Sequence, residues 1–176
     1  MTDFLTDVDT LRDRARRNMM SGPVTASYGT DVDRVVELLN TALATETVCV
    51  LRYRQHYFTA KGLDSEPVAS EFLAHSNEEQ EHADRLSNRI VQLGGSPLLD
   101  PSQLTGRAHS EYRTADDLKQ MIRENLVAER VAIASYTEMI NWIGAADPTT
   151  RRVLESILAK EEEHADEMLT FLEPQG

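Results

Sequence analysis

Apolar residues recur every three or four positions along most of this chain, which is the period of an α-helix buried on one side. Turn signals interrupt the pattern at Ser21-Gly22-Pro23 and at Gly94-Gly95, and Asp147-Pro148 supplies an N-cap followed by a first-turn proline. The sequence therefore predicts an all-α fold, with a short amphipathic helix within residues 1–20 and four long helices at about 31–59, 67–93, 114–143 and 148–172.

The connections between these helices constrain how they pack. The first and second long helices, and likewise the third and fourth, have short connections, so each pair is predicted to be antiparallel. The connection at about 95–113 is longer and rich in proline, glycine, serine and aspartate. Extended chain of this length reaches up to roughly 60 Å, whereas one such helix measures roughly 40 Å. We therefore expect a four-helix bundle in which one long crossover makes the second and third long helices parallel.

A glutamate interrupts each of the four apolar stripes near the middle of its helix. Along the third long helix, steps of four and three residues meet Leu118, Ile122, Leu126, Glu129, Ile133, Tyr136, Ile140 and Ile143. Most helical glutamates are solvated, but a buried carboxylate without a partner costs several kcal/mol and is not expected to recur on four stripes. We interpret the four side chains as ligands that converge on one metal centre: Glu46, Glu79, Glu129 and Glu161.

Two of these glutamates belong to copies of a Glu-x-x-His motif, Glu79 with His82 and Glu161 with His164. Residues three positions apart lie on one helical face, so each pair can bind one metal ion. The two remaining glutamates each precede a motif by one long helix and a turn, so the chain reads as a duplicated helix pair. Four carboxylates balance two divalent ions, and mixed oxygen and nitrogen ligands suit iron or manganese, with zinc as an inert competitor.

Other residues near the motifs receive different interpretations. Cys49, between Val48 and Val50, is predicted to be a packed core residue. His75 lies on the buried stripe one turn before Glu79, where it either lines an access path or is a core histidine with satisfied hydrogen bonds. The glutamates that lie off the stripes are predicted to be surface charges: Glu78, Glu81, Glu162 and Glu163.

The composition excludes several classes of protein. One cysteine in 176 residues excludes an internal disulfide and any multi-cysteine zinc or iron centre. No apolar run is long enough for a signal peptide or a membrane span, which indicates a cytoplasmic protein. A net charge of −12 disfavours nucleic acid as the main partner and suits a protein that concentrates cations.

The N-terminal part of the chain differs from the rest. Residues 1–30 are predicted to form a leader helix and tail in front of a bundle domain at 31–176. The end of this helix carries a basic cluster from Arg12 to Arg17, for which contact with DNA is one interpretation. We favour a different interpretation, in which the leader helix pairs with acidic helices or packs on another subunit. The apolar side of the helix comprises Phe4, Leu5, Val8 and Leu11.

With these motifs in place, residues 31–172 resemble a bacterioferritin-type protein of the ferritin-like di-iron class. The resemblance implies a ferritin-like bundle in which the two motif glutamates bridge two iron ions, while the other two glutamates and the two histidines each bind one. The matching positions are Glu46, Glu79, His82, Glu129, Glu161 and His164.

The resemblance also covers Tyr53, which matches a tyrosine near the di-iron site and is otherwise a core aromatic with a hydrogen-bonded hydroxyl. Gln80 replaces the methionine that binds haem in bacterioferritins, so haem is not expected. Asn125 stands where an aspartate can support a ligand histidine, which implies lower histidine basicity. The chain ends at Gly176 without a short fifth helix, and with its leader it is more similar to dodecameric Dps-like shells than to 24-subunit ones. It lacks the cysteine pair of some of those relatives.

The function implied is a ferroxidase that oxidises Fe²⁺ with O₂ or H₂O₂ and stores or detoxifies iron in a hollow homo-oligomer. Two alternatives remain open at this point. A non-storing di-iron oxidase or peroxidase, similar to rubrerythrin, uses the same ligands without a mineral. A DNA-protecting Dps-like shell has only the arginine cluster of the leader in its support.

Overall fold

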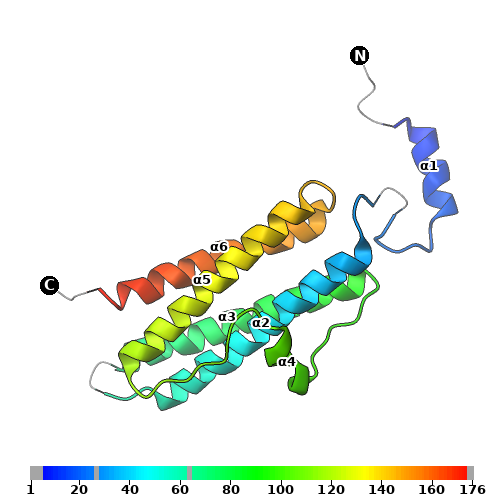
Figure 1. Cartoon of the computed structure of the whole chain (residues 1–176). Helices are drawn as coiled ribbons and strands as arrows, with labels where there is room; N and C mark the ends of the chain where they lie inside the picture. The colour runs from blue at the N-terminus through cyan, green and yellow to red at the C-terminus, as the bar shows by residue number, and fades with distance from the viewer. Residues whose placement is uncertain (1–5, 26–27, 63–64, 174–176) are drawn as a thin grey trace.

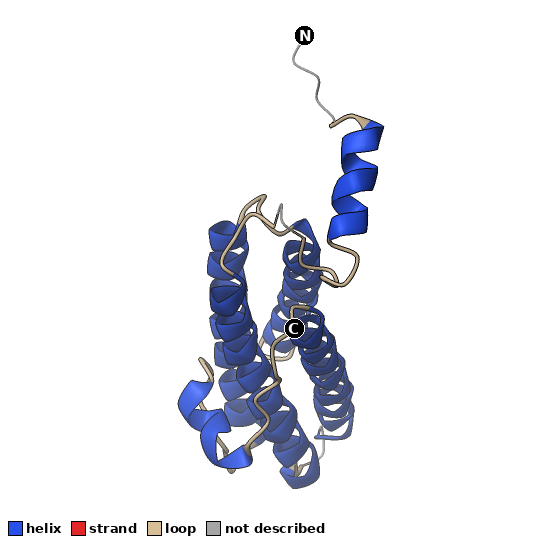
Figure 2. Ribbon diagram, turned by 90° about the vertical axis from the view of Figure 1, so that its right-hand side faces the viewer, coloured by secondary structure: helices blue, strands red, loops and turns tan. Residues whose placement is uncertain are grey.

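The computed structural model describes residues 6–25, 28–62 and 65–173, and within these ranges it contains six helices and no strand (Figures 1 and 2). The predicted all-α fold is confirmed. None of the described helices has a stretch both long and apolar enough for a membrane crossing. The helices are α1 (Val8–Arg17), α2 (Val32–Thr59), α3 (Ser65–Gln92), α4 (Pro101–Arg107), α5 (Leu118–Ile143) and α6 (Pro148–Thr170).

The four long helices form the predicted bundle. In Figure 1, α2 and α3 run antiparallel, as do α5 and α6, and the segment between α3 and α5 crosses the full length of the bundle. As a result α3 and α5 point in the same direction, which is the arrangement of ferritin-like folds with one long crossover.

Local capping explains where the helices begin and end. The Asp147 carboxylate accepts a hydrogen bond from the Thr150 amide and caps α6 as predicted. The third long helix begins at Leu118 rather than near 114, because the Asp117 side chain caps it by accepting from the Gln120 amide. Near the end of α3, Gly94 adopts a φ of 84°, a left-handed conformation that favours glycine.

The crossover contains a short helix, α4, that the sequence pattern did not predict. It begins after Asp100, whose carboxylate accepts from the Ser102 amide. Leu104 is its buried residue, and it packs on Ala44 and Val48 of α2. One buried apolar residue in a seven-residue helix cannot show a helical period in the sequence.

Polar side chains of α2 hold the rest of the crossover against the bundle. Asn40 accepts from the Leu98 amide at 2.8 Å, and the Thr45 hydroxyl accepts from the His109 amide at 3.0 Å. The Arg52 guanidinium donates to a crossover carbonyl at 3.2 Å. The crossover lies beside α2 without being helical at these points, so its backbone groups need hydrogen-bond partners from side chains. This explains why α2 buries these three polar residues.

The two larger apolar clusters lie at opposite ends of the bundle. One includes Leu39 and Leu43 from α2, and the other includes Tyr53 from the same helix. Glu46 lies between these positions, so a polar layer separates the two halves of the core. The dominant buried side chains of the first cluster are Leu86, Ile90, Tyr136, Leu154 and Ile157, and those of the second are Phe72, Met121 and Met168.

Helix α1 stands away from the bundle in both views. It buries no residue, and Val8 and Leu11 are 58% and 48% exposed. Phe4 and Leu5, which the sequence placed on the same apolar side, lie outside the described residues. The described part of the apolar side therefore has no packing partner among the residues that the structure describes.

Candidate metal centre

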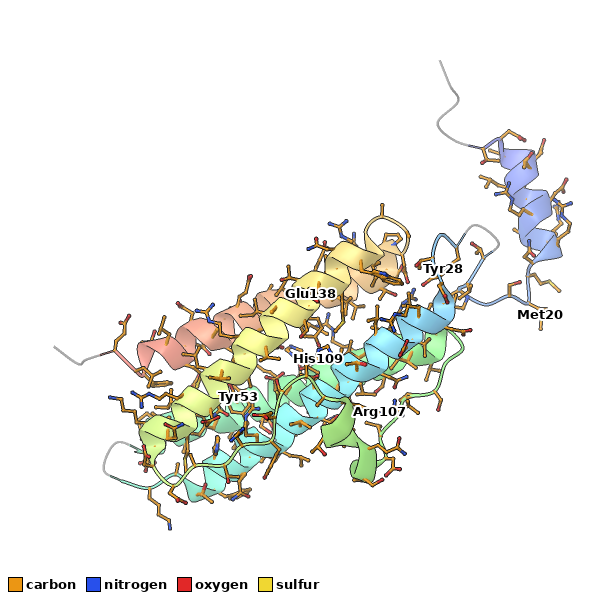
Figure 3. The ribbon with its side chains drawn as sticks, viewed as in Figure 1. Met20, Tyr28, Tyr53, Arg107, His109 and Glu138 are labelled. Carbon is orange, nitrogen blue, oxygen red and sulfur yellow. The ribbon has the colours of Figure 1, made fainter. Side chains whose placement is uncertain are left out.

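The structure brings the six side chains predicted as metal ligands into one pocket at the middle of the bundle. Each of the four long helices contributes, and each side chain is almost fully buried. Tyr53, labelled in Figure 3, contacts one of these side chains through its hydroxyl group. The six are Glu46 from α2, Glu79 and His82 from α3, Glu129 from α5, and Glu161 and His164 from α6.

Both histidines direct their Nδ1 atom at carboxylates of the pocket. His82 Nδ1 lies 2.8 Å from an oxygen of Glu161, 3.1 Å from Glu79 and 3.3 Å from Glu46. His164 Nδ1 is 3.4 Å from Glu79 and 4.0 Å from an oxygen of Glu129. Each imidazole thus faces carboxylates from more than one helix.

These atoms form two overlapping sets, each with its ligand atoms within 4.8 Å of one another. Glu79 and Glu161 belong to both sets, so their carboxylates can bridge two metal ions. The first set adds Glu46 and His82, and the second adds Glu129 and His164.

Two tyrosines hold the outer carboxylates. The Tyr53 hydroxyl donates to Glu129 Oε1 at 2.5 Å, and the Tyr136 hydroxyl donates to Glu46 Oε1 at 2.5 Å. Each tyrosine therefore bonds the glutamate of the opposite helix pair. The sequence analysis missed Tyr136 as a site residue, although it follows Glu129 at the same spacing at which Tyr53 follows Glu46.

Glu78 lies at the surface as predicted, but it also bonds a histidine of the pocket, which the sequence did not indicate. Its carboxylate is only partly exposed and accepts from His164 Nε2 at 2.6 Å. This hydrogen bond keeps the other ring nitrogen of His164, Nδ1, directed into the pocket. The remaining off-stripe glutamates, Glu81, Glu162 and Glu163, are exposed as predicted.

Burial and mutual repulsion control the protonation of the carboxyl groups. Burial, followed by the charge of Glu79, raises the pKa of Glu46 to about 8. Burial and the charges of Glu79 and Glu46 likewise raise the pKa of Glu161 well above its usual value. Burial acts in the same direction on Glu79, but hydrogen bonds from His164 and His82 hold its pKa well below the usual range.

Burial acts in the opposite direction on the pKa of a histidine, because its charged form is the protonated one. Burial lowers the pKa of His82, but hydrogen bonds with Glu46 and Glu79 outweigh it and raise that pKa to about 10. For His164, burial is again outweighed, by the hydrogen bond with Glu79 and by nearby charges, and the pKa rises to about 9. Protons therefore neutralise much of the carboxylate charge when no other cation does so.

The pocket retains ligand atoms that no protein group fully satisfies. Within the described part of the chain, Glu129 Oε2 is buried without a hydrogen bond, and Glu79 Oε1 and His164 Nδ1 lie 3.4 Å apart, which is long for a hydrogen bond. Each buried acceptor left unpaired costs about 1–3 kcal/mol, and more when it is charged. Two divalent cations at these atoms remove that cost, so the donor set fits a pair of metal ions.

A buried arginine lies beside the pocket, which the sequence pattern did not indicate. Arg52 Nε donates to Asn125 Oδ1 at 3.0 Å, and the guanidinium also contacts Cys49 Sγ at 3.4 Å. His56 Nδ1 lies 3.2 Å from the same oxygen of Asn125. Asn125 therefore bonds Arg52 and His56, and none of its hydrogen bonds among the described residues joins it to either ligand histidine. Cys49 is buried as predicted.

His75 is buried next to the pocket with both ring nitrogens engaged. Nδ1 lies 3.1 Å from the Tyr53 hydroxyl, and Nε2 lies 2.7 Å from an oxygen of Glu167. Its ring stacks on that of His164 at 3.9 Å between centroids. It therefore has satisfied hydrogen bonds and also connects the pocket with a partly exposed carboxylate.

Comparison with known proteins identifies relatives with this architecture. A family model of the ferritin-like domain matches residues 36–174. A bacterioferritin of Brucella melitensis is 32% identical over 145 residues, which cover 81% of this chain and 82% of that protein. A nutrient stress-induced DNA-binding protein of Synechococcus sp. is 31% identical over 147 residues, or 80% and 82% of the two chains.

Solved structures agree with these relatives. A dodecameric thioferritin, the bacterioferritin-related protein from Bacteroides fragilis, superposes with a TM-score of 0.79 at 34% identity and covers 82% of this chain and 87% of its own. Dps from Thermosynechococcus elongatus shares the fold, with a TM-score of 0.77 at 21% identity over 81% and 92% of the two chains. Together with the match over residues 36–174, these similarities show that the chain belongs to the ferritin-like family.

Proposed function

We propose that this protein is a cytoplasmic ferroxidase that oxidises Fe²⁺ inside the bundle and stores or detoxifies the product as ferric mineral. The observation that carries the proposal is the pocket itself, where six buried side chains from four helices offer two overlapping sets of ligand atoms. The unpaired Glu129 Oε2 and the weakly paired Glu79 Oε1 and His164 Nδ1, all buried, support cation binding there.

In this proposal two Fe²⁺ ions bind as substrates. Glu79 and Glu161 bridge them, and one outer glutamate and one histidine complete each position. The four carboxylates carry a formal charge of −4, which two Fe²⁺ ions offset, so the loaded pocket is close to neutral. A near-neutral site in a low-dielectric interior avoids the cost of an uncompensated buried charge.

The chemistry requires one electron from each Fe²⁺, which O₂ or H₂O₂ accepts. Tyr53 and Tyr136 keep the outer carboxylates in place through their hydroxyl groups. Glu78 holds His164 through Nε2 so that Nδ1 faces the pocket. The surrounding apolar clusters exclude bulk water from the site.

Storage requires a hollow oligomer, and we infer a homo-oligomer, with twelve subunits favoured over twenty-four. The thioferritin from Bacteroides fragilis is described as dodecameric, which supports this number. The bundle also leaves large apolar side chains exposed, among them Phe58, Leu51, Val127 and Trp142, and contacts between subunits would cover them. A net charge of −12 on every subunit attracts Fe²⁺ to the assembly.

The test is the amount of iron retained per subunit after aerobic loading with Fe²⁺ and desalting. Storage predicts tens of iron atoms per subunit. Retention of about two, with continued turnover, would instead identify the non-storing di-iron oxidase or peroxidase. A Glu46→Ala/Glu129→Ala variant serves as the control, since it should neither oxidise iron rapidly nor retain it.

A DNA-protecting shell is the second candidate function, supported by the Synechococcus relative and by the position of α1 away from the bundle. The basic cluster of α1 is partly neutralised, because Arg12 pairs with Asp9 and Arg16 pairs with Asp13. A salt-dependent gel shift that disappears on deletion of residues 1–20 would favour this function. Absence of any shift at low salt would exclude it.

A further inference from the structure

A third group of metal-binding side chains lies beside the pocket. Glu71 and His75 are one turn apart on α3, and Glu167 faces them from α6, with ligand atoms within 4.8 Å of one another. The group extends from the interior to the surface, because His75 is buried whereas the Glu167 side chain is 48% exposed. None of these residues belongs to the six-residue pocket described above.

The hydrogen bonds of His75 determine which of its nitrogens is available. Tyr53 has one hydroxyl proton and donates it to Glu129 at 2.5 Å, so its oxygen must accept from His75 Nδ1 at 3.1 Å. Nε2 is then the nitrogen left for a ligand. It faces a Glu167 oxygen at 2.7 Å, a distance at which either a proton or a metal ion joins the two atoms.

The pocket itself offers a comparison for this contact. His82 Nδ1 and Glu161 Oε1, both predicted ligands, lie 2.8 Å apart, close to the 2.7 Å between His75 Nε2 and Glu167. The hydrogen bond from Nδ1 to the Tyr53 hydroxyl orients the imidazole of His75, as outer partners do for histidine ligands of metals. Glu71, one turn from His75, adds a second carboxylate on the same face.

We propose that Glu71, His75 and Glu167 form a third metal site that binds one divalent transition-metal ion at the edge of the di-iron pocket. One imidazole and two carboxylates suit Fe²⁺, Mn²⁺, Co²⁺ or Zn²⁺. The exposed side of the group leaves coordination positions for water. Binding here requires no redox step, and fewer protein ligands make this site weaker than the two positions of the pocket.

The site is coupled to the pocket by two contacts. The His75 ring stacks on His164 at 3.9 Å, and its Nδ1 reaches Tyr53, which in turn holds Glu129. An ion at Nε2 fixes the position of the His75 ring. The third site therefore adjoins the pocket on the side of Glu129 and His164.

The test is anaerobic Co²⁺ binding to the full-length protein by equilibrium dialysis, at an ionic strength that screens weak surface binding. Wild type should bind two ions tightly and a third more weakly. A Glu71→Gln/Glu167→Gln variant should lose the third ion alone. Both positions are partly or fully exposed, so the variant is expected to fold, which thermal melting checks. The matched control, Glu162→Gln/Asp166→Asn, removes two exposed carboxylates of α6 and should still bind three.

The possible outcomes separate this proposal from the proposed function. A third ion that is retained by the Glu71→Gln/Glu167→Gln variant, or that is missing from wild type, overturns the third site and leaves the ferroxidase pocket untouched. Absence of the two tight ions from wild type instead contradicts the pocket. Equal loss of the third ion in the control variant assigns it to general surface charge and also overturns the site.

Discussion

Loading the pocket with divalent metal should release protons, because three of its groups hold protons that metal binding displaces. The pKa of Glu46 is about 8, that of His82 about 10 and that of His164 about 9. At pH 7 a group with a pKa of 8 is about nine-tenths protonated, and the two histidines are almost fully so. All three must lose a proton to bind a metal ion.

The expected release is therefore about three protons per pair of tightly bound ions, and Glu161, whose pKa is also raised, can add a fourth. Each displaced proton makes the affinity rise about tenfold per pH unit. Between pH 6 and pH 7 the joint affinity for the two ions should thus increase by about three orders of magnitude.

Anaerobic Co²⁺ titration by calorimetry, repeated in buffers of different ionisation enthalpy, measures this proton count. A Glu46→Gln variant should release about one proton fewer, because glutamine has no proton to lose at this position. Glu163→Gln, at an exposed position, should match wild type. Release of fewer than one proton, or an affinity that does not change with pH, would refute the reasoning.

Three further predictions concern activity and stability. Glu46→Ala or Glu129→Ala should abolish rapid Fe²⁺ oxidation in stopped-flow absorbance with the fold intact, whereas Glu163→Gln should keep the wild-type rate. In the metal-free protein, Glu46 contributes to the free energy of unfolding because its pKa is raised from 4.5 to about 8. This stabilising contribution is complete below pH 4.5 and is lost as the pH rises through about 8. Urea midpoints of the metal-free protein should accordingly be lower at pH 8.5 than at pH 6, and a higher midpoint at pH 8.5 would contradict this assignment. Arg89→Ala leaves Asp147, its ion-pair partner at 3.0 Å, buried without that cation, so unfolding should become easier by about 3–5 kcal/mol. A loss below about 1 kcal/mol in urea melts would show that the pair is solvated.

The sequence carried enough information for the long helices and the six pocket residues, because both depend on a periodicity that can be counted along the chain. Glu79 is an example, because it lies among apolar residues at helical spacing. Burying such a carboxylate destabilises the fold unless another group binds it. The length of the crossover likewise sufficed to predict the direction of α5.

Contacts across helices were decided by the tertiary structure alone. That Tyr53 bonds Glu129, and Tyr136 bonds Glu46, depends on which side chains meet when two helix pairs pack together. The contact of Glu78 with His164 has the same origin. Periodicity states which face of a helix is buried, but the register and rotation of neighbouring helices determine its partners.

The same reason applies to Arg52 and to α4. An arginine is normally expected at the surface, and the crossover carbonyl, the Asn125 side chain and Cys49 Sγ together offset the cost of burying this one. The short helix α4 forms where Leu104 packs on Ala44 and Val48 of α2, a contact between residues distant in sequence. Local patterns along the chain thus determined the four long helices and their polar centre. The short helix α4 and the pairing of specific side chains required the packed fold, because they depend on distances between segments that are far apart in the sequence.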